Sequence, residues 1–211
     1  GNTALDNGGA FAMYSGCSPD ILNSIFWSNN AASGEEIYAS AGGGTTPTPR
    51  FSHANIQGGI FGNRVVASGA SDNGGNINAD PLFQASERAA GPDETFRTTD
   101  DGLRLAEDSP CIDTGNTSAN SQPLDVAAAP RNMRTGVDMG AYETPKVIYV
   151  DGTHTSGDGT SWSTAFPDIQ PALDTVAAND QIWVAEGIYR PTNPVDTADP
   201  RTVTFAIPSD V

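Results

Sequence analysis

The segment SPDILNSIFW, residues 18–27, resembles TPRFSHANIQ, residues 48–57, and aligns Ile21 with Phe51, 30 residues later. A repeat of about 20–50 residues indicates a solenoid or a similar array, because one repeat cannot bury its apolar face alone. In the segment 18–27, apolar side chains occur at both odd and even positions, so both faces of the expected strand carry them. That pattern fits short strands with one face on an inner core and the other face partly covered.

A second pair of segments supports the repeat at a different spacing. GGAFAMY, residues 8–14, resembles GEEIYAS, residues 34–40, and aligns Phe11 with Ile37, 26 residues later. The extra residues of the longer spacing fall in AGGGTTP, residues 41–47, which reads as a turn insertion.

The composition supports many short strands joined by tight turns. The chain has 23 Gly and 15 Pro, and its hydrophobic content of 37% allows a lean core. The net charge is −16 and there is no basic patch, which excludes nucleic acid as a partner. No run of about 18 apolar residues occurs, so no membrane span is predicted.

The sequence changes character after residue 145, where it predicts a strand, a helix and further strands. Asp168 is the expected N-cap of the helix, and Pro171 lies in its first turn. Such a short amphipathic helix, with its apolar residues on one face, would cover the exposed end of a β-solenoid. The expected elements are a strand at 147–150, a helix at 168–178, and strands at 181–185 and 202–207.

Residues 62–145 are less regular. Asp80 and Asp113 lie in expected tight turns, where an Asp side chain bonds nearby backbone amides. Candidate strands in this region lie near 102–105, 111–113 and 137–143.

Several of these segments together resemble a known family. They look like the C-terminal part of right-handed parallel β-helix proteins, the pectate-lyase-like surface proteins of bacteria called choice-of-anchor Q proteins. Residues 147–189, with TSW at 160–162 and IWVAEGIY at 182–189, resemble the N-terminal cap of the same family. The segments that carry the first resemblance are NSIFWSN (23–29), NADPLF (78–83), LRL (103–105), SPCIDTG (109–115) and VDMGAYE (137–143).

The resemblance implies an all-β fold, a right-handed parallel β-helix with one short capping helix. Residues 1–145 would be C-terminal coils and tail, and residues 146–211 the cap and first strands of a following or neighbour-completing β-helix. The cap follows the coils, which reverses the family's order. We therefore expect tandem domains, or subunits completed by their neighbours.

Three functions are open at this point. Members of the family are secreted and held at cell surfaces, so the first is an extracellular structural repeat that stacks head to tail with copies of itself into a fibre or stalk, with adhesion as one use. The second is a carbohydrate-binding module for a surface polysaccharide. The third is a fragment of a polysaccharide lyase or hydrolase whose active coils lie elsewhere.

No catalytic, cofactor-binding or metal-binding residue is predicted, and we lean against an enzyme. A lyase of this fold needs an acidic calcium site beside a basic residue, yet Lys146 is the single lysine and the arginines are scattered. Glu35 and Glu36 are adjacent, so they should face opposite ways and be solvated rather than act as a hydrolase pair. A calcium site stays open, since Asp151, Asp158 and Asp180 could supply its oxygens. His53 and His154 each lack a second nearby ligand, which disfavours zinc.

Trp162 is the one ligand-binding candidate, as an exposed ring that could stack on a sugar. Trp27 and Trp183 lie in strand patterns and are expected to fill the core. Cys17 and Cys111 are expected to be buried thiols, with a disulfide between them as the alternative.

Overall fold

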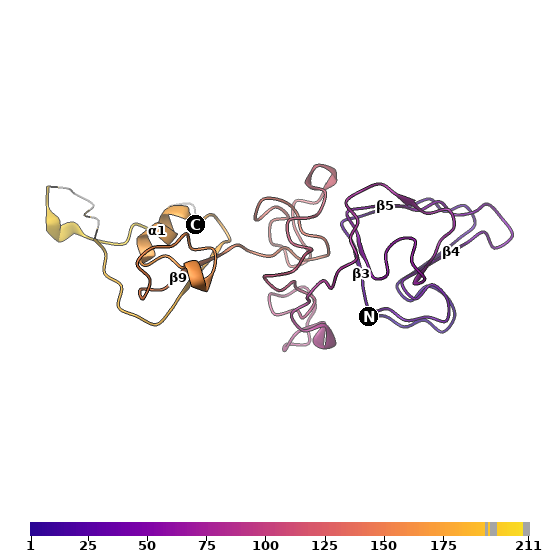
Figure 1. The fold of residues 1–211 in the computed structure, drawn as a ribbon, viewed down its shortest axis with the longest axis horizontal. Helices are drawn as coiled ribbons and strands as arrows, with labels where there is room; N and C mark the ends of the chain where they lie inside the picture. Colours follow the sequence, from indigo (N-terminus) through magenta and orange to yellow (C-terminus); the bar gives the residue numbers. More distant parts are fainter. Residues whose placement is uncertain (193, 195–197, 209–211) are drawn as a thin grey trace. The chain divides into compact units, whose positions relative to one another are not determined.

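The structure is a computed structural model that describes residues 1–192, 194 and 198–208. The chain divides into two compact units, Gly1–Thr144 and Pro145–Val211, which are described separately (Figure 1). The predicted second domain, 146–211, includes residues 193, 195–197 and 209–211, which lie outside the described residues.

Unit 1 is a parallel β-helix. Its strands form three parallel sheets with the orders β1-β4-β7, β2-β5-β8 and β3-β6, so each coil adds one strand to a sheet (Figure 1). The strands are β1 (Phe11–Tyr14), β2 (Asp20–Leu22), β3 (Ile25–Phe26), β4 (Ile37–Ser40), β5 (Arg50–Ser52), β6 (Asn55–Ile56), β7 (Val65–Val66) and β8 (Ser71–Asp72).

The register of these sheets confirms both predicted spacings. Phe11 lies opposite Ile37 in the β1–β4 pair, and Ile21 lies opposite Phe51 in the β2–β5 pair. The longer spacing is absorbed by the turn at 41–47, as expected. The all-β parallel fold with one short α-helix is therefore confirmed.

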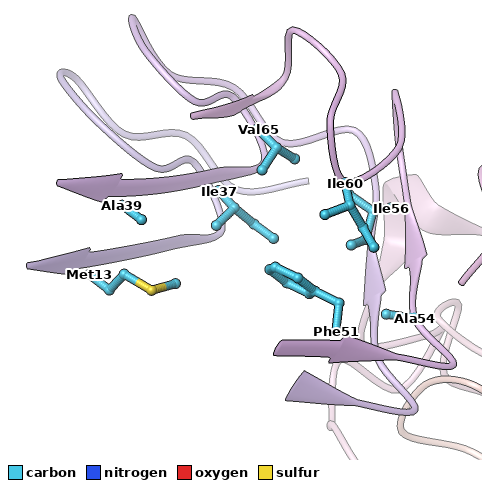
Figure 2. Close-up of a cluster of buried hydrophobic side chains, with 8 residues drawn as sticks. All are labelled: Met13, Ile37, Ala39, Phe51, Ala54, Ile56, Ile60 and Val65. Carbon is cyan, nitrogen blue, oxygen red and sulfur yellow. The ribbon is translucent and has the colours of Figure 1, made fainter. Parts of the chain in front are cut away.

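The core of unit 1 is built from the inward-facing side chains of successive coils. Phe51, Ile37 and Ile56 are fully buried, and Met13 and Val65 pack in the same cluster (Figure 2). Figure 2 shows Ile37 of β4 and Phe51 of β5 pointing toward each other, with Val65 of β7 and Ile56 of β6 beside them. Stacking one coil on the next is thus what removes each coil's apolar side chains from water.

One expectation in this region is wrong, because Glu36 is fully buried rather than solvated. Its Oε1 accepts hydrogen bonds from the Asn29 backbone N–H (3.2 Å) and from Nη2 of Arg64 (2.9 Å). Arg64 also pairs with Glu35, so this arginine does have acidic neighbours. Burial raises the pKa of Glu36, and the hydrogen bonds from Asn29 oppose that shift.

The tail of unit 1 does not form the strands expected near 102–105, 111–113 and 137–143. A single antiparallel bridge, Phe83 to Leu105, stands where they were predicted. The apolar residues instead form a separate cluster of Leu105, Cys111 and Met139, against which Ile25 packs. The tail contains the short 3₁₀ helices η1 (Ser86–Arg88) and η2 (Thr117–Ala119).

Unit 2 contains both predicted strands, β9 (Val147–Val150) and β10 (Gln181–Val184), and pairs them in parallel. Helix α1 (Ile169–Thr175) is capped by Asp168, whose side chain accepts the Ile169 N–H. The helix ends three residues before the predicted end, because Val176 is extended.

Helix α1 covers β9. Ala172 of the helix is buried with Ile148 and Val150, and Ile169 and Val176 pack against them. The strand expected at 202–207 is absent; a 3₁₀ helix, η4 (Pro200–Thr202), and an isolated bridge at Val203 stand there. None of the described helices is long and apolar enough to cross a membrane.

Phe51 gives a direct test of the stacked core. Replacing it by Ala should lower the free energy of unfolding by about 3–5 kcal/mol, because the lost ring leaves a cavity between coils. Phe61, 74% exposed, provides the matched control, and Phe61→Ala should change stability little. Urea denaturation followed by circular dichroism measures both, and equal effects would contradict this packing.

Candidate functional site

The first coil of unit 1 presents open strand edges. Among the described residues, β1, β2 and β3 each have a strand partner on one side only. The N–H groups of Phe11 and Ser15 donate to the next coil. Since alternate N–H groups of a strand point to opposite edges, those of Ala12 and Tyr14 point to the open side. This edge can accept another strand.

Unit 2 is closed on one side and open on the other. The outer edge of β9 is covered by Phe166, whose N–H donates to the Tyr149 carbonyl (2.9 Å) and whose carbonyl accepts the Asp151 N–H (2.9 Å). On the other side of β9 lies β10, which has no further strand partner among the described residues. Gln181 and Ala185 donate their N–H groups to the β9 side, so the N–H of Val184 points outward.

Trp162 lies at the start of the 3₁₀ helix η3 (Trp162–Thr164) and is 45% exposed. The structure brings it together with two aromatic residues that the sequence did not link to it. The centroid of the Trp162 ring is 4.9 Å from that of Tyr149, and Trp183 lies 5.9 Å from Tyr149 on β9. Both contacts are edge-on, which is a favoured geometry for aromatic pairs.

A short polar loop holds Trp162 in place. Oδ1 of Asp158 accepts hydrogen bonds from the hydroxyl (2.7 Å) and the backbone N–H (3.0 Å) of Thr160. These bonds lower the pKa of Asp158. Gly159 has a φ of +74°, and a side chain there would meet the ring of Phe166. The loop therefore depends on Asp and Gly at these two positions.

The other two tryptophans differ from expectation. Trp183 is 47% exposed rather than buried in the core, because it lies on the face of β10 opposite to Ile182, which packs toward α1. Its Nε1 donates to Oε1 of Gln181 (2.9 Å), which fixes the ring. Trp27 is half-buried beside Phe83, where both line a hollow of about 570 Å³ in unit 1.

A buried charge cluster in the tail was missed at the sequence level. Glu143 and Asp138 are buried, and Nη1 of Arg131 lies 2.9 Å from Oε1 of Glu143. Burial, together with the nearby charge of Asp138, raises the pKa of Glu143 to about 8 despite the attraction of Arg131. Burial also raises the pKa of Asp138. The sequence carries one signal for this cluster, the two acidic residues Asp138 and Glu143 within the otherwise largely apolar segment VDMGAYE.

The carboxylates of this cluster accept backbone hydrogen bonds, which is a structural role. Oδ1 of Asp138 accepts the Asp113 N–H (2.9 Å), and Oδ2 accepts the Thr144 N–H (2.8 Å). Glu143 accepts the Asp138 N–H. The carboxylates thus replace the hydrogen bonds that a sheet would have supplied to these segments.

The two aspartates expected in turns do bond backbone amides. Asp80 accepts the N–H of Leu82 two residues later (2.9 Å), as predicted. Asp113 instead accepts the N–H groups of Thr135 (3.0 Å) and Gly136 (2.8 Å), so it joins two distant segments.

The candidate calcium ligands are each engaged in their own turns. Asp151 accepts from Thr153, Asp158 from Thr160, and Asp180 from Ala177. In the part of the chain that the structure describes, no group of three or more His, Cys, Asp or Glu residues is arranged to hold a metal ion. Calcium binding stays a prediction.

The histidines and cysteines are separate from one another. His53 shares a hydrogen bond with Ser52, and Nε2 of His154 lies 3.8 Å from Oδ2 of Asp151. Cys111 is buried, as expected, and accepts from Nδ2 of Asn55 (3.1 Å). Cys17 is exposed, which contradicts its expected burial, and both thiols are free.

Comparison with known proteins found no match to a family model, to a curated protein or to a solved structure.

The buried Glu143 predicts a pH dependence of stability. The pKa of Glu143 in the folded state, about 8, lies above the ordinary value of 4.5. Between pH 4.5 and 8 the folded state therefore keeps a proton that the unfolded state has lost. The stabilisation is complete below pH 4.5 and is lost as the pH rises through 8. Between pH 5 and 8 this residue should lower the free energy of unfolding by up to about 1.4 kcal/mol per pH unit.

Denaturant titrations at pH 5, 6.5 and 8 measure this effect. Glu143→Gln keeps the shape but cannot ionise, so its stability should fall less over this range than that of the wild type. Glu87→Gln, at an exposed position, is the matched control and should follow the wild type. Parallel pH profiles for the wild type and Glu143→Gln would show that Glu143 does not titrate in this window.

Proposed function

We propose that this protein is an extracellular structural module that stacks head to tail with copies of itself into a fibre or stalk. One observation carries the proposal. Among the described residues, the strands of the first coil of unit 1 and strand β10 of unit 2 each belong to a parallel sheet and lack a strand partner on one side. An open β10 of one copy and an open β1 of the next copy have complementary unpaired backbone groups.

The chemistry of the two edges favours pairing. Natural proteins protect exposed strand edges with charges, Pro or bulges. Strand β1 reads FAMY and β10 reads QIWV, with no charged residue and no Pro in either. Phe11 and Tyr14 on β1 and Val184 on β10 leave substantial apolar surface exposed. Pairing of the two edges would cover this apolar surface and would also give hydrogen-bond partners to the unpaired backbone N–H and C=O groups.

The net charge of −16 opposes close approach of copies. We therefore expect assembly to strengthen with salt, since about 0.15 M salt screens charges beyond roughly 8 Å. The resemblance of the sequence to pectate-lyase-like, choice-of-anchor Q surface proteins supports an extracellular, cell-surface location for such a fibre.

Two proline variants test the stacking directly. Ala12→Pro removes an outward N–H from β1, and Val184→Pro removes one from β10, without touching the bonds inside either pair. The wild type should form concentration-dependent oligomers in analytical ultracentrifugation at 0.15 M salt. Each variant alone should stay monomeric, because a contact needs both edges and every copy of a variant lacks the same one, whereas Ala12→Ser should behave like the wild type.

Mixing the two variants separates stacking from other association. An equimolar mixture should form a heterodimer through the two intact edges, and neither variant should form it alone. A wild-type chain that stays folded and monomeric at high concentration would contradict the proposal. Circular dichroism spectra of both variants report whether each substitution preserves the fold.

A second function, carbohydrate binding, is favoured by the aromatic cluster of Trp162, Tyr149 and Trp183. Exposed tryptophan rings can pack on the apolar face of a sugar, and the acidic chain favours a neutral glycan over an acidic one. Neutral oligosaccharides such as cellohexaose should quench tryptophan fluorescence. Trp162→Ala should weaken that binding about tenfold, while Phe61→Ala should not change it; no quenching by any neutral glycan tested would argue against this function.

A further inference from the structure

A cavity of about 640 Å³ lies within unit 1, where the end of β2 faces two loops of the tail. Ligand pockets in proteins range from about 300 to 1,000 Å³, so its volume suits a small organic ligand. It shares no residue with β1, β10 or the Trp162 cluster, and neither the stacking nor the sugar-binding proposal uses it. Its lining includes Leu22, Asn23, Arg97, Gln122, Asp125 and Arg131.

The floor of the cavity is polar, buried and already satisfied. Arg131 is paired with Glu143 and donates from Nη1 to the Gly140 carbonyl (3.1 Å). Oδ1 of Asp125 accepts the N–H groups of Ala127 (2.8 Å) and Ala129 (2.9 Å). These groups are held in place by their hydrogen bonds, so the floor is a rigid surface.

The rim differs, because it carries free donors. Arg97 and Gln122 are exposed, and among the described residues neither the guanidinium of Arg97 nor the amide of Gln122 makes a hydrogen bond or an ion pair. The backbone at Arg97 is nevertheless held firmly. Its N–H (2.6 Å) and that of Thr98 (2.9 Å) both donate to Oδ2 of the buried Asp101.

Arg97 is also conformationally unusual. Its φ is +74°, in the left-handed region that residues with a side chain rarely adopt. Such strain persists only where the surroundings impose it, and it is concentrated at functional sites. The hydrogen bonds to Asp101 hold the backbone in this conformation, and Arg97 lines the cavity.

The walls are aliphatic. Leu124 and Val126 are exposed at the cavity, and Leu22 of β2 is half-buried beside them. A ligand that matches these surfaces needs an anionic group for Arg97, a hydrogen-bonding group for Gln122 and an apolar part for the walls.

We propose that this cavity binds a small organic carboxylate that carries a further hydrogen-bonding group and an aliphatic part. A guanidinium pairs with a carboxylate through two parallel hydrogen bonds. A phosphate could pair in the same way, but its second charge would be repelled more strongly by a chain of net charge −16. The carboxylate can belong to an acylated amino acid or to an acylated sugar acid.

Two pairs of probes test the proposal on the full chain by isothermal titration calorimetry. N-acetyl-leucine is compared with N-acetyl-leucinamide, and N-acetylneuraminate with neutral N-acetylglucosamine. At least one carboxylate should bind, and its neutral counterpart should bind about tenfold more weakly or not at all. The carboxylate that binds identifies the source of the ligand.

Arg97→Gln should weaken binding of that carboxylate about tenfold or more. Arg88→Gln makes the same charge change at an exposed site outside the cavity and should leave binding unchanged. Chemical shifts of the tail residues show whether Arg97→Gln keeps the fold. Three outcomes would overturn the proposal. They are no binding of either carboxylate at concentrations on the order of 10 mM, equal binding of the charged and neutral probes, and undiminished binding by a folded Arg97→Gln.

Discussion

The buried carboxylate of Glu36 is the constraint on which the coil arrangement of unit 1 depends. It sits at the start of the second coil, accepts from Asn29 at the end of the first, and is paired with Arg64 at the start of the third. A carboxylate without these partners would be costly to bury, and loss of one partner would leave the charge uncompensated. The three coils are therefore tied together by one side chain as well as by the parallel ladders above and below it.

Carboxylates play a comparable part in the tail, where regular sheets are absent. Asp113, Asp125 and Asp138 accept backbone N–H groups from distant parts of the tail, and Asp101 accepts those of the nearby Arg97 and Thr98. A segment without a sheet ladder must satisfy its amides by other means, and here acidic side chains supply the acceptors. Part of the chain's strong negative charge is thus internal structure rather than solvated surface, which changes how the composition should be interpreted.

The sequence predicted the parallel β-helix and its register because the repeat aligns residues that pair in space, as with Ile21 and Phe51. It did not predict the fold of the tail, where pairing depends on contacts between residues such as Asp113 and Gly136 that follow no periodicity. Glu36 was misjudged because adjacent acids usually lie in water, and its partner Arg64 is distant in sequence. Trp162 was found as an exposed ring, yet its grouping with Tyr149 and Trp183 depends on the β9–β10 pairing.

The insertion at 41–47 has a consequence for the adaptability of this fold. Paired residues are 26 positions apart at Phe11 and Ile37, 30 at Ile21 and Phe51, and 21 at Phe51 and Asp72, yet the strands stay aligned. The turn has open space around it, since no other atom lies within 4 Å of the side-chain position at Gly43, although its φ of +90° favours glycine itself. Strand alignment and turn length are therefore uncoupled, so new peptide sequences can be gained at this corner without disturbing the interior, which makes it a natural place for diversification and for display of foreign epitopes.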